Sequence, residues 1–504
     1  MTLFRLSVAV VVGIGVCGTW ALPGKAAELR VGHSSLPQAL GNPLPDTSHS
    51  SGFSYLTAYD QLTYVDESGP KEGLAVSWQN TSPTTWRFKL RPGVLFHDGK
   101  RLAASDIADQ INWLNTKEGS ALGSSTFSNV RSLVSASAID DLTVEVTTRE
   151  PDPMVPATGA GLRVLNMKHF ADVGFEGYGR APIGTGPFKV ESWAGDQVRL
   201  VAFTQGWRPP KLERITIRNL PELAARVQAF QSAQVDLAFQ LVADNRSAIE
   251  GAGGKLHVST EPRVLLLMAY QNRPGHPIHD KRVRLALNHA VNKDGFINGL
   301  MGGLTIAAGQ PGARGVTGYQ PDIRPYPLDL NKAKSLLSEA GFPNGLKLSA
   351  EVVSNVSEMR DVYQQVSLDA ARIGVDIVVR EITLPDLLGK VRDPSKFGEA
   401  TLFSFGFNSM PTMDIMRSIN SQHSCKSLTK WICFPDIEPA IAAANSEFDP
   451  AKRGRLLREI ALFYREHAPG IYLHEPVLVD GVKARVRNYK PVNYVINWHE
   501  VAMQ

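Results

Sequence analysis

Apolar and polar residues alternate in several short stretches of the first half of the chain, which is the spacing of strands that bury one face. Trp86, Phe88 and Leu90 alternate with polar residues just before a turn at Pro92 and Gly93. The strands predicted in this way are residues 28–32, 86–90, 142–146, 198–203 and 214–218. One helix is expected among them, over residues 106–114, with Ser105 as its N-cap.

In the second half of the chain, apolar residues recur at the three- and four-residue intervals of helices. Val283, Ala286 and Leu287 begin one such stripe, and Asp329 is expected to cap a later helix that Gly341 ends. Further helices are predicted over 362–373, 439–444 and 453–467, and strands over 375–382 and 401–405. This alternation of helices and strands predicts an α/β fold.

Length and composition narrow the class of protein. The 504 residues exceed what one ordinary hydrophobic core organises, so we expect two to four domains. Apolar residues make up 43% and charged residues 20%, a balance that excludes an intrinsically disordered chain. The formal net charge is only +4, which argues against a nucleic acid as the main partner.

The first 26 residues have the pattern of a cleavable signal peptide. Arg5 precedes an apolar segment, residues 6–18, that is too short to span a bilayer comfortably, and the small residues Gly24 and Ala26 follow it. We therefore expect an exported protein of the periplasm, with an N-terminal membrane anchor as the alternative. The GxGxxG pattern of residues 13–18 lies in this segment after no strand, so it does not predict a nucleotide site.

Two cysteines, Cys425 and Cys433, lie beyond the signal segment. Because export permits disulfides, we expect this pair to be joined, with two separate buried thiols as the alternative. A zinc site is disfavoured, since no second cysteine pair is near and His423 is the only close histidine.

Common catalytic motifs are missing from the sequence. It contains no GxSxG, HExxH or CxxC, and residues 93–100 have five residues between the glycines where a phosphate-binding loop needs four. No cofactor is therefore expected, and an exported enzyme is a disfavoured class.

A series of segments resembles the peptide/nickel class of extracellular solute-binding proteins, which supply ABC importers. The resemblance is carried by residues 74–78, 86–94, 96–99 and the GTGPF of 184–188. It implies a two-lobed α/β clamp, similar to type II periplasmic binding proteins with an extra inserted domain, whose hinges close the lobes over a ligand cleft. The implied protein is a monomer whose partners are a small-molecule or peptide ligand and the ABC permease subunits of the inner membrane.

The same resemblance implies how the domains follow one another. Domain I is expected to combine residues 28–62, 186–272 and 482–504, with domain II, residues 63–185, inserted into it. Domain III, residues 273–481, is the expected second lobe. The end of the chain should then return to the N-terminal lobe.

In dipeptide-binding relatives, a carboxylate in the loop that corresponds to residues 404–411 pairs with the α-ammonium group of the ligand. Phe407 takes this acidic position here, and Met410 stands where a second aspartate is usual. A buried ammonium group without a counter-charge is costly, so free-amine dipeptides are disfavoured unless Asp414 or Glu399 substitutes.

The resemblance implies both apolar and polar side chains at the ligand site. Phe405, Phe407 and Met410 suggest an apolar wall, unless they belong to the core. The expected polar contacts are Arg163, Lys390, Asn408, Arg417, Thr47 and Ser48.

Arg163 matches an arginine that holds ligand carboxylates in the nickel-binding relative, although a structural salt bridge would also explain it. The expected solute is therefore a short or modified peptide, or another molecule with a carboxylate. His423 matches the nickel-site histidine of that relative, so a metal-chelate-binding protein is one alternative. A peptide-binding chaperone or sensor on the same fold is another.

Overall fold

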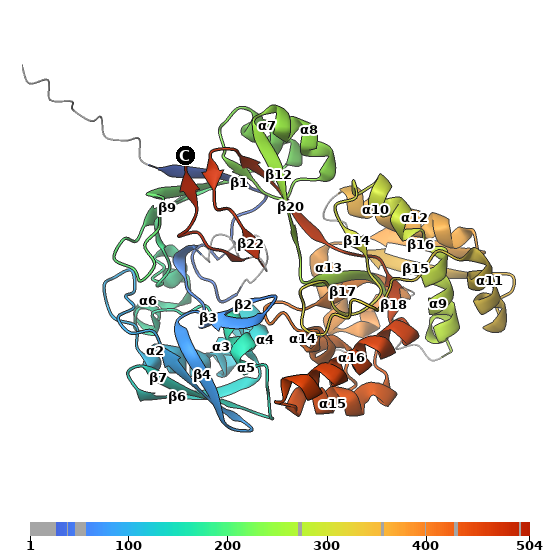
Figure 1. Ribbon diagram of the computed structural model, residues 1–504, viewed down its shortest axis with the longest axis horizontal. Coiled ribbons are helices and arrows are strands. Elements are labelled where there is room, and N and C mark those ends of the chain that lie inside the picture. Colours follow the sequence, from blue (N-terminus) through green and yellow to red (C-terminus); the bar gives the residue numbers. More distant parts are fainter. Residues whose placement is uncertain are drawn as a thin grey trace, which may run out of the picture.

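Three sheets of four or more strands organise the described part of the chain into domains I, II and III (Figure 1). The computed structural model describes residues 27–37, 39–45, 57–270, 275–353, 357–398, 400–427, 432–492 and 495–504. Across these ranges, no helix has the length and apolar character needed to cross a membrane.

Domain I is built on a seven-stranded sheet whose strands come from distant parts of the chain. β1 (Glu28–His33) pairs in parallel with β10 (Arg214–Asn219) and with β11 (Leu237–Ala238). The other strands are β8 (Phe188–Ala194), β9 (Gln197–Ala202), β12 (Gly254–Thr260) and β20 (Val477–Lys483). The sheet order is β12-β20-β11-β1-β10-β9-β8.

The two faces of this sheet are covered by different parts of the chain. Buried side chains of α7 (Leu223–Gln231) and α8 (Arg246–Gly251) pack on one face. On the other face, Leu29 and Val31 pack with Trp498 near the C-terminus. The short strands of this last segment are β21 (Val486–Arg487), β22 (Pro491–Val492), β23 (Val495–Ile496) and β24 (Ala502–Met503). The end of the chain therefore lies beside its first strand (Figure 1).

Domain II contains an antiparallel sheet with the order β4-β5-β7-β6. Its strands are β4 (Ala75–Ser82), β5 (Thr85–Leu90), β6 (Leu133–Asp140) and β7 (Thr143–Thr148), preceded by the hairpin β2 (Thr63–Asp66) and β3 (Gly69–Glu72). Its helices are α2 (Ala104–Leu114), α3 (Lys117–Leu122), α4 (Ser124–Val130), α5 (Val155–Thr158) and α6 (Met167–Arg180). Trp86, Phe88 and Leu90 point into the core, as their alternation predicts.

The start of α2 differs from the prediction. Ser105 is not the N-cap, because the helix already begins at Ala104 and its cap is Ala103. The backbone N–H of Ala103 donates to Asp106 Oδ2 at 2.9 Å. Asp106 thus accepts from the backbone N–H of the cap residue, as the third residue of a capping box does.

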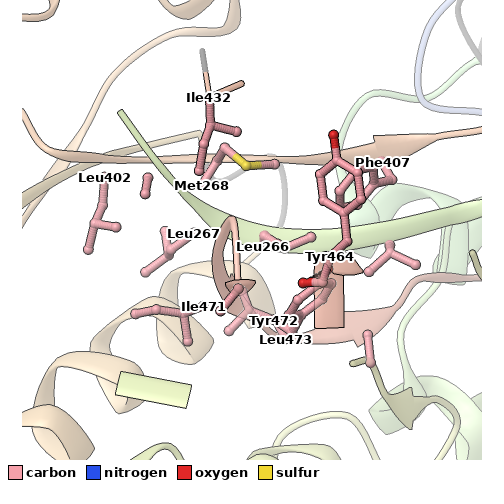
Figure 2. Packing of buried hydrophobic residues seen from close by; sticks show 14 of the residues in the cluster. Leu266, Leu267, Met268, Leu402, Phe407, Ile432, Tyr464, Ile471, Tyr472 and Leu473 are labelled. Carbon is pink, nitrogen blue, oxygen red and sulfur yellow. Dashed lines mark hydrogen bonds between the residues drawn. The ribbon is translucent and has the colours of Figure 1, made fainter. Parts of the chain in front are cut away.

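Domain III is built on a five-stranded sheet with the order β16-β15-β17-β13-β18. The strands are β13 (Arg263–Ala269), β15 (Leu346–Val352), β16 (Val375–Glu381), β17 (Leu402–Asn408) and β18 (Gly470–Tyr472). The helices include α9 (Lys281–Ala290), α11 (Leu330–Glu339), α12 (Ser357–Ala371), α13 (Leu384–Arg392), α15 (Glu438–Ser446) and α16 (Pro450–His467). Leu266 and Leu267 of β13 lie fully buried at the centre of its core (Figure 2).

The chain passes twice between domains I and III, and both crossings lie closer to the sheets than expected. β12 belongs to domain I and β13 to domain III, so the first crossing is at Glu261 and Pro262 rather than near residue 272. The second is at Pro476, because β20 pairs in domain I rather than ending domain III at 481. The backbone N–H of Glu261 donates to Pro476 O at 3.0 Å, which fastens the two crossings together.

Candidate ligand-binding site

Domains II and III meet where the loop after β17 reaches Gly161 of domain II. A Cβ atom added to Gly161 would lie 3.0 Å from Asn129 Cβ and 3.1 Å from Pro411 Cγ, so only a glycine permits this close approach without a shift. Val65 and Ala160 of domain II also belong to the cluster of buried residues that forms the domain III core. The two lobes are therefore in direct contact beside the predicted ligand loop.

The predicted loop itself is ordered by its own side chains. Asn408 accepts a hydrogen bond from the Met410 backbone N–H at 3.0 Å, and the Ser409 N–H donates to Pro262 O at 3.0 Å. The second bond ties the loop to the crossing between domains I and III. Phe405, Asn408 and Met410 remain partly exposed, so their side chains are available at the boundary.

Phe407 lies in the interior of domain III. Only 1% of its surface is exposed, and its ring stacks on His423 with centroids 4.5 Å apart. Tyr464 contacts it edge-on at 5.6 Å, an arrangement that Figure 2 shows from close by. In the described structure Phe407 therefore belongs to the hydrophobic core of domain III, which was the alternative to an apolar wall at the ligand site.

His423 is a core residue at the end of a π-helical turn, Ile419–His423. Its side chain is fully buried, and burial lowers the pKa of its imidazole to about 3. Within the described ranges, no three His, Cys, Asp or Glu side chains are grouped so that they could hold a metal ion. The described residues thus give the metal-chelate alternative no set of ligands around His423.

Arg163 lies two residues after Gly161, the residue of domain II that touches Pro411. It is 9% exposed and follows the turn Gly159–Gly161, whose last residue touches Pro411. Its backbone forms a bridge with Gln61, and its carbonyl oxygen accepts a hydrogen bond from Gln110 Nε2 at 2.8 Å. The backbone that carries this guanidinium group is therefore held rigidly.

Lys390 is engaged within its own lobe. Its Nζ lies 2.5 and 2.6 Å from the two carboxylate oxygens of Glu351 on β15. A pocket of about 350 Å³ lies beside it, lined also by Asp386 and Lys396. Because Glu351 already balances its charge, Lys390 is a weaker candidate for a ligand carboxylate than its position in the sequence implied.

Arg417 spans the boundary between the lobes. Its NH2 donates to Asn129 Oδ1 of domain II at 3.0 Å, and its NH1 donates to Ser421 Oγ at 3.2 Å. Burial, with the nearby positive charge of Arg131, lowers the pKa of its guanidinium group to about 10. Neither Asn129 nor Arg131 was predicted at the site, because both lie in domain II far from any matching motif.

Of the two acidic substitutes expected near the loop, the structure describes Asp414. Asp414 accepts from Arg453 NH1 at 2.6 Å and from the Met416 N–H at 2.8 Å, so it is already paired inside domain III. Glu399, Thr47 and Ser48 lie outside the described residues.

One further prediction near the site is confirmed. Cys425 and Cys433 form a disulfide, with Cα atoms 5.0 Å apart. The Cys425 N–H and the Ser424 hydroxyl donate to the two carboxylate oxygens of Glu438 at 2.7 and 3.0 Å. This link joins the end of the π-helical turn to the start of α15.

A two-lobed α/β clamp with two crossings and an inserted domain is the architecture of periplasmic binding proteins. The family model described as bacterial extracellular solute-binding proteins, family 5 Middle, matches residues 69–424, and the chain belongs to this family. The curated relatives found are named as binding proteins, and one of the solved structures is described as an ABC transporter-associated periplasmic binding protein.

Curated relatives and solved structures agree with this assignment. A glutathione-binding protein of Pectobacterium atrosepticum is 25% identical over 80% of this chain and 80% of its own length. The alignment with a relative of the same name in Escherichia coli K12 covers 58% of this chain and 57% of that protein.

Two solved structures share the fold along most of their length. The binding protein DppA of Helicobacter pylori, in complex with the peptide STSA, superposes with a TM-score of 0.78 at 20% identity, over 95% of this chain and 98% of that one. NikA of Staphylococcus aureus, in complex with a nickel–histidine compound, gives 0.76 at 18% identity, over 95% and 100%.

Proposed function

We propose that this protein is the periplasmic, monomeric binding subunit of an ABC importer, and that it delivers a small organic solute bearing a carboxylate to permease subunits of the inner membrane. A short or modified peptide is the main candidate. The curated glutathione-binding relatives support this class, because glutathione is itself a modified tripeptide with carboxylate groups. The protein acts by binding and release, without catalysis.

The proposed ligand class rests on the charges of the side chains near Gly161, where domains II and III meet. The acidic position of dipeptide-binding relatives is filled by the buried Phe407, and Asp414 is neutralised by Arg453. Arg163 and Arg417 stand nearby on the two sides of the boundary. Guanidinium groups at this boundary, with the carboxylate of Asp414 already paired, favour the anionic end of a solute over its ammonium end.

The test is calorimetric titration with glutathione as the probe, in wild type and in Arg163→Ala. Removing the guanidinium group should weaken binding roughly tenfold to a few hundredfold, since a hydrogen bond between charged groups contributes about 1.5–3 kcal/mol. The matched control is Arg149→Ala, because Arg149 is exposed on domain II. Its affinity for glutathione should equal that of wild type.

Two results would contradict the proposal. Equal affinity of Arg163→Ala and wild type would make Arg163 a structural residue. If glutathione fails to bind, the solute retained by protein from its native periplasm is identified by mass spectrometry. A retained solute with only positive charge would overturn the proposed ligand class.

A further inference from the structure

Two arginines, one from each lobe, face each other at the edge of the domain II–III contact. Arg131 follows α4 of domain II, and Arg417 belongs to the short helix α14 (Met416–Ser418) of domain III. Figure 1 shows α4 and α14 next to each other where the lobes meet. The two groups lie close enough for the positive charge of Arg131 to lower the pKa of Arg417.

Reciprocal hydrogen bonds hold the pair in place. Arg417 NH2 donates to Asn129 Oδ1 at 3.0 Å, and Arg131 NH2 donates to Asn420 O at 3.3 Å. Each arginine therefore reaches across the boundary to a neutral acceptor near the base of the other. This crossed arrangement brings two positive charges together whenever the lobes are closed.

Neither guanidinium group forms an ion pair with a carboxylate of the described residues, whereas two other arginines with little exposed side-chain surface do. Arg208 pairs with Asp60, and Arg453 pairs with Asp414. Burial at the boundary lowers the pKa of Arg417, so this contact disfavours its positive charge. Like charges held together without a counter-ion oppose closure unless an anion joins them.

We propose that Arg131 and Arg417 form an anion-binding site that straddles the lobes and receives a carboxylate of the transported solute. This inference rests on the proposed function and names a second anchor within it. Arg131 is exposed at the rim, so an anion can enter, and Asn129 places the pair beside Gly161 and Pro411. The anion lies between one positive charge from each lobe, so its negative charge stabilises the closed form of the protein.

The first experiment compares glutathione with its diethyl ester, in which both carboxylates are neutral, by calorimetry in wild type, Arg417→Gln and Arg131→Gln. Wild type should prefer the free acid, and each variant should lose about tenfold or more of that preference, the usual effect of removing a charge-assisted hydrogen bond. Affinity for the ester should change by less than about twofold, because the ester offers the arginines no anion. Arg149→Gln is the control with the same charge change at an exposed site.

The second experiment uses sulfate as an inorganic probe. Sulfate should raise the melting temperature of wild type and of Arg149→Gln more than that of Arg417→Gln or Arg131→Gln. Small-angle X-ray scattering should show that glutathione compacts wild type more fully than it compacts either variant.

These outcomes separate this inference from the proposed function. If glutathione binds wild type and both arginine variants equally, the protein is still a solute-binding protein, but the arginine pair is not part of its ligand site. If sulfate stabilises wild type through the pair while wild type does not distinguish glutathione from its ester, the site holds an inorganic anion only and the solute assignment is wrong. If glutathione binds neither wild type nor any variant, the sulfate experiment alone tests whether the arginine pair binds anions. In that case, equal stabilisation of wild type and the variants by sulfate would overturn the proposed anion site.

Discussion

Buried carboxyl groups of domain I differ in whether a cation accompanies them. Asp236 accepts hydrogen bonds from Arg30 Nε at 3.0 Å and from Arg485 Nε at 2.8 Å. Asp480, on β20, is equally buried but accepts only from the Tyr489 hydroxyl at 2.7 Å and the Gln240 N–H at 3.2 Å among the described residues. Burial without a cation raises the pKa of Asp480 from 3.8 to about 7.

Asp480 should therefore make stability depend on pH. Because the folded state holds this proton more tightly than the unfolded state, its contribution is fully present below pH 3.8 and is lost as the pH rises to about 7. The slope from one such group is at most about 1.4 kcal/mol per pH unit. Asp480→Asn should flatten the curve of melting temperature against pH across this range.

The exposed Asp376 provides the control for this measurement. Asp376→Asn should leave the pH dependence as it is in wild type. If Asp480→Asn shows the same slope as wild type between these pH values, the carboxyl group of Asp480 is ionised in the folded protein and the argument fails.

At the scale of helices and strands, the sequence predicted best those features that depend on neighbouring residues, such as helix caps and helix ends. Asp329 caps α11 by accepting from the Lys332 N–H at 2.9 Å, and Gly341 follows with a φ of 91°, as predicted. These features depend on residues a few positions apart, so a reader of the sequence sees both partners. The cap of α2 was misplaced because Ala103 takes the N-cap position and Asp106, rather than Ser105, bonds to the backbone there.

The candidate site was less predictable, because its contacts join residues that are far apart in the chain. Motif spacing located the loop 404–411, but it could not show that Phe407 points inward against His423. Asn129 and Arg131 carry no motif, and only folding brings them to Arg417. The ion pair of Lys390 with Glu351 could not be predicted either, because β15 brings Glu351 from a distant part of the sequence.

The disulfide is the element-level feature with the most direct test. On the chain-entropy account, a small loop of this size stabilises the fold by roughly 2.5 kcal/mol. Cys425→Ser with Cys433→Ser should lower the melting temperature by a few degrees, and a reducing agent should lower that of wild type similarly. The double variant should not respond to the reductant. A wild type whose bond is opened, by thiol assay, without any change in melting temperature would contradict this expectation.

At the scale of the whole molecule, closure depends on two short crossings and on the contacts between domains II and III. The crossings are fastened together at Glu261 and Pro476. The opposing surfaces meet at Gly161 and Pro411, and the arginines lie beside that contact. A hinge of this kind moves the lobes as units, so small charge differences at the rim act on the entire equilibrium between open and closed forms.

The position of β20 in the domain I sheet also sets an order of events for a newly made chain. β1 is one of the first segments to leave the ribosome or the export channel, yet its sheet stays incomplete until β20 has followed almost the whole sequence. The sheet of domain II uses only neighbouring segments and can form much earlier.

Pulse-labelling hydrogen exchange during refolding of the full chain should protect β5 and β7 before β1 and β20. Simultaneous protection of both sheets would show that the chain folds in one step. Otherwise β11 and β12 wait with the edges that β20 later joins unpaired, and an unpaired strand edge can pair with another chain.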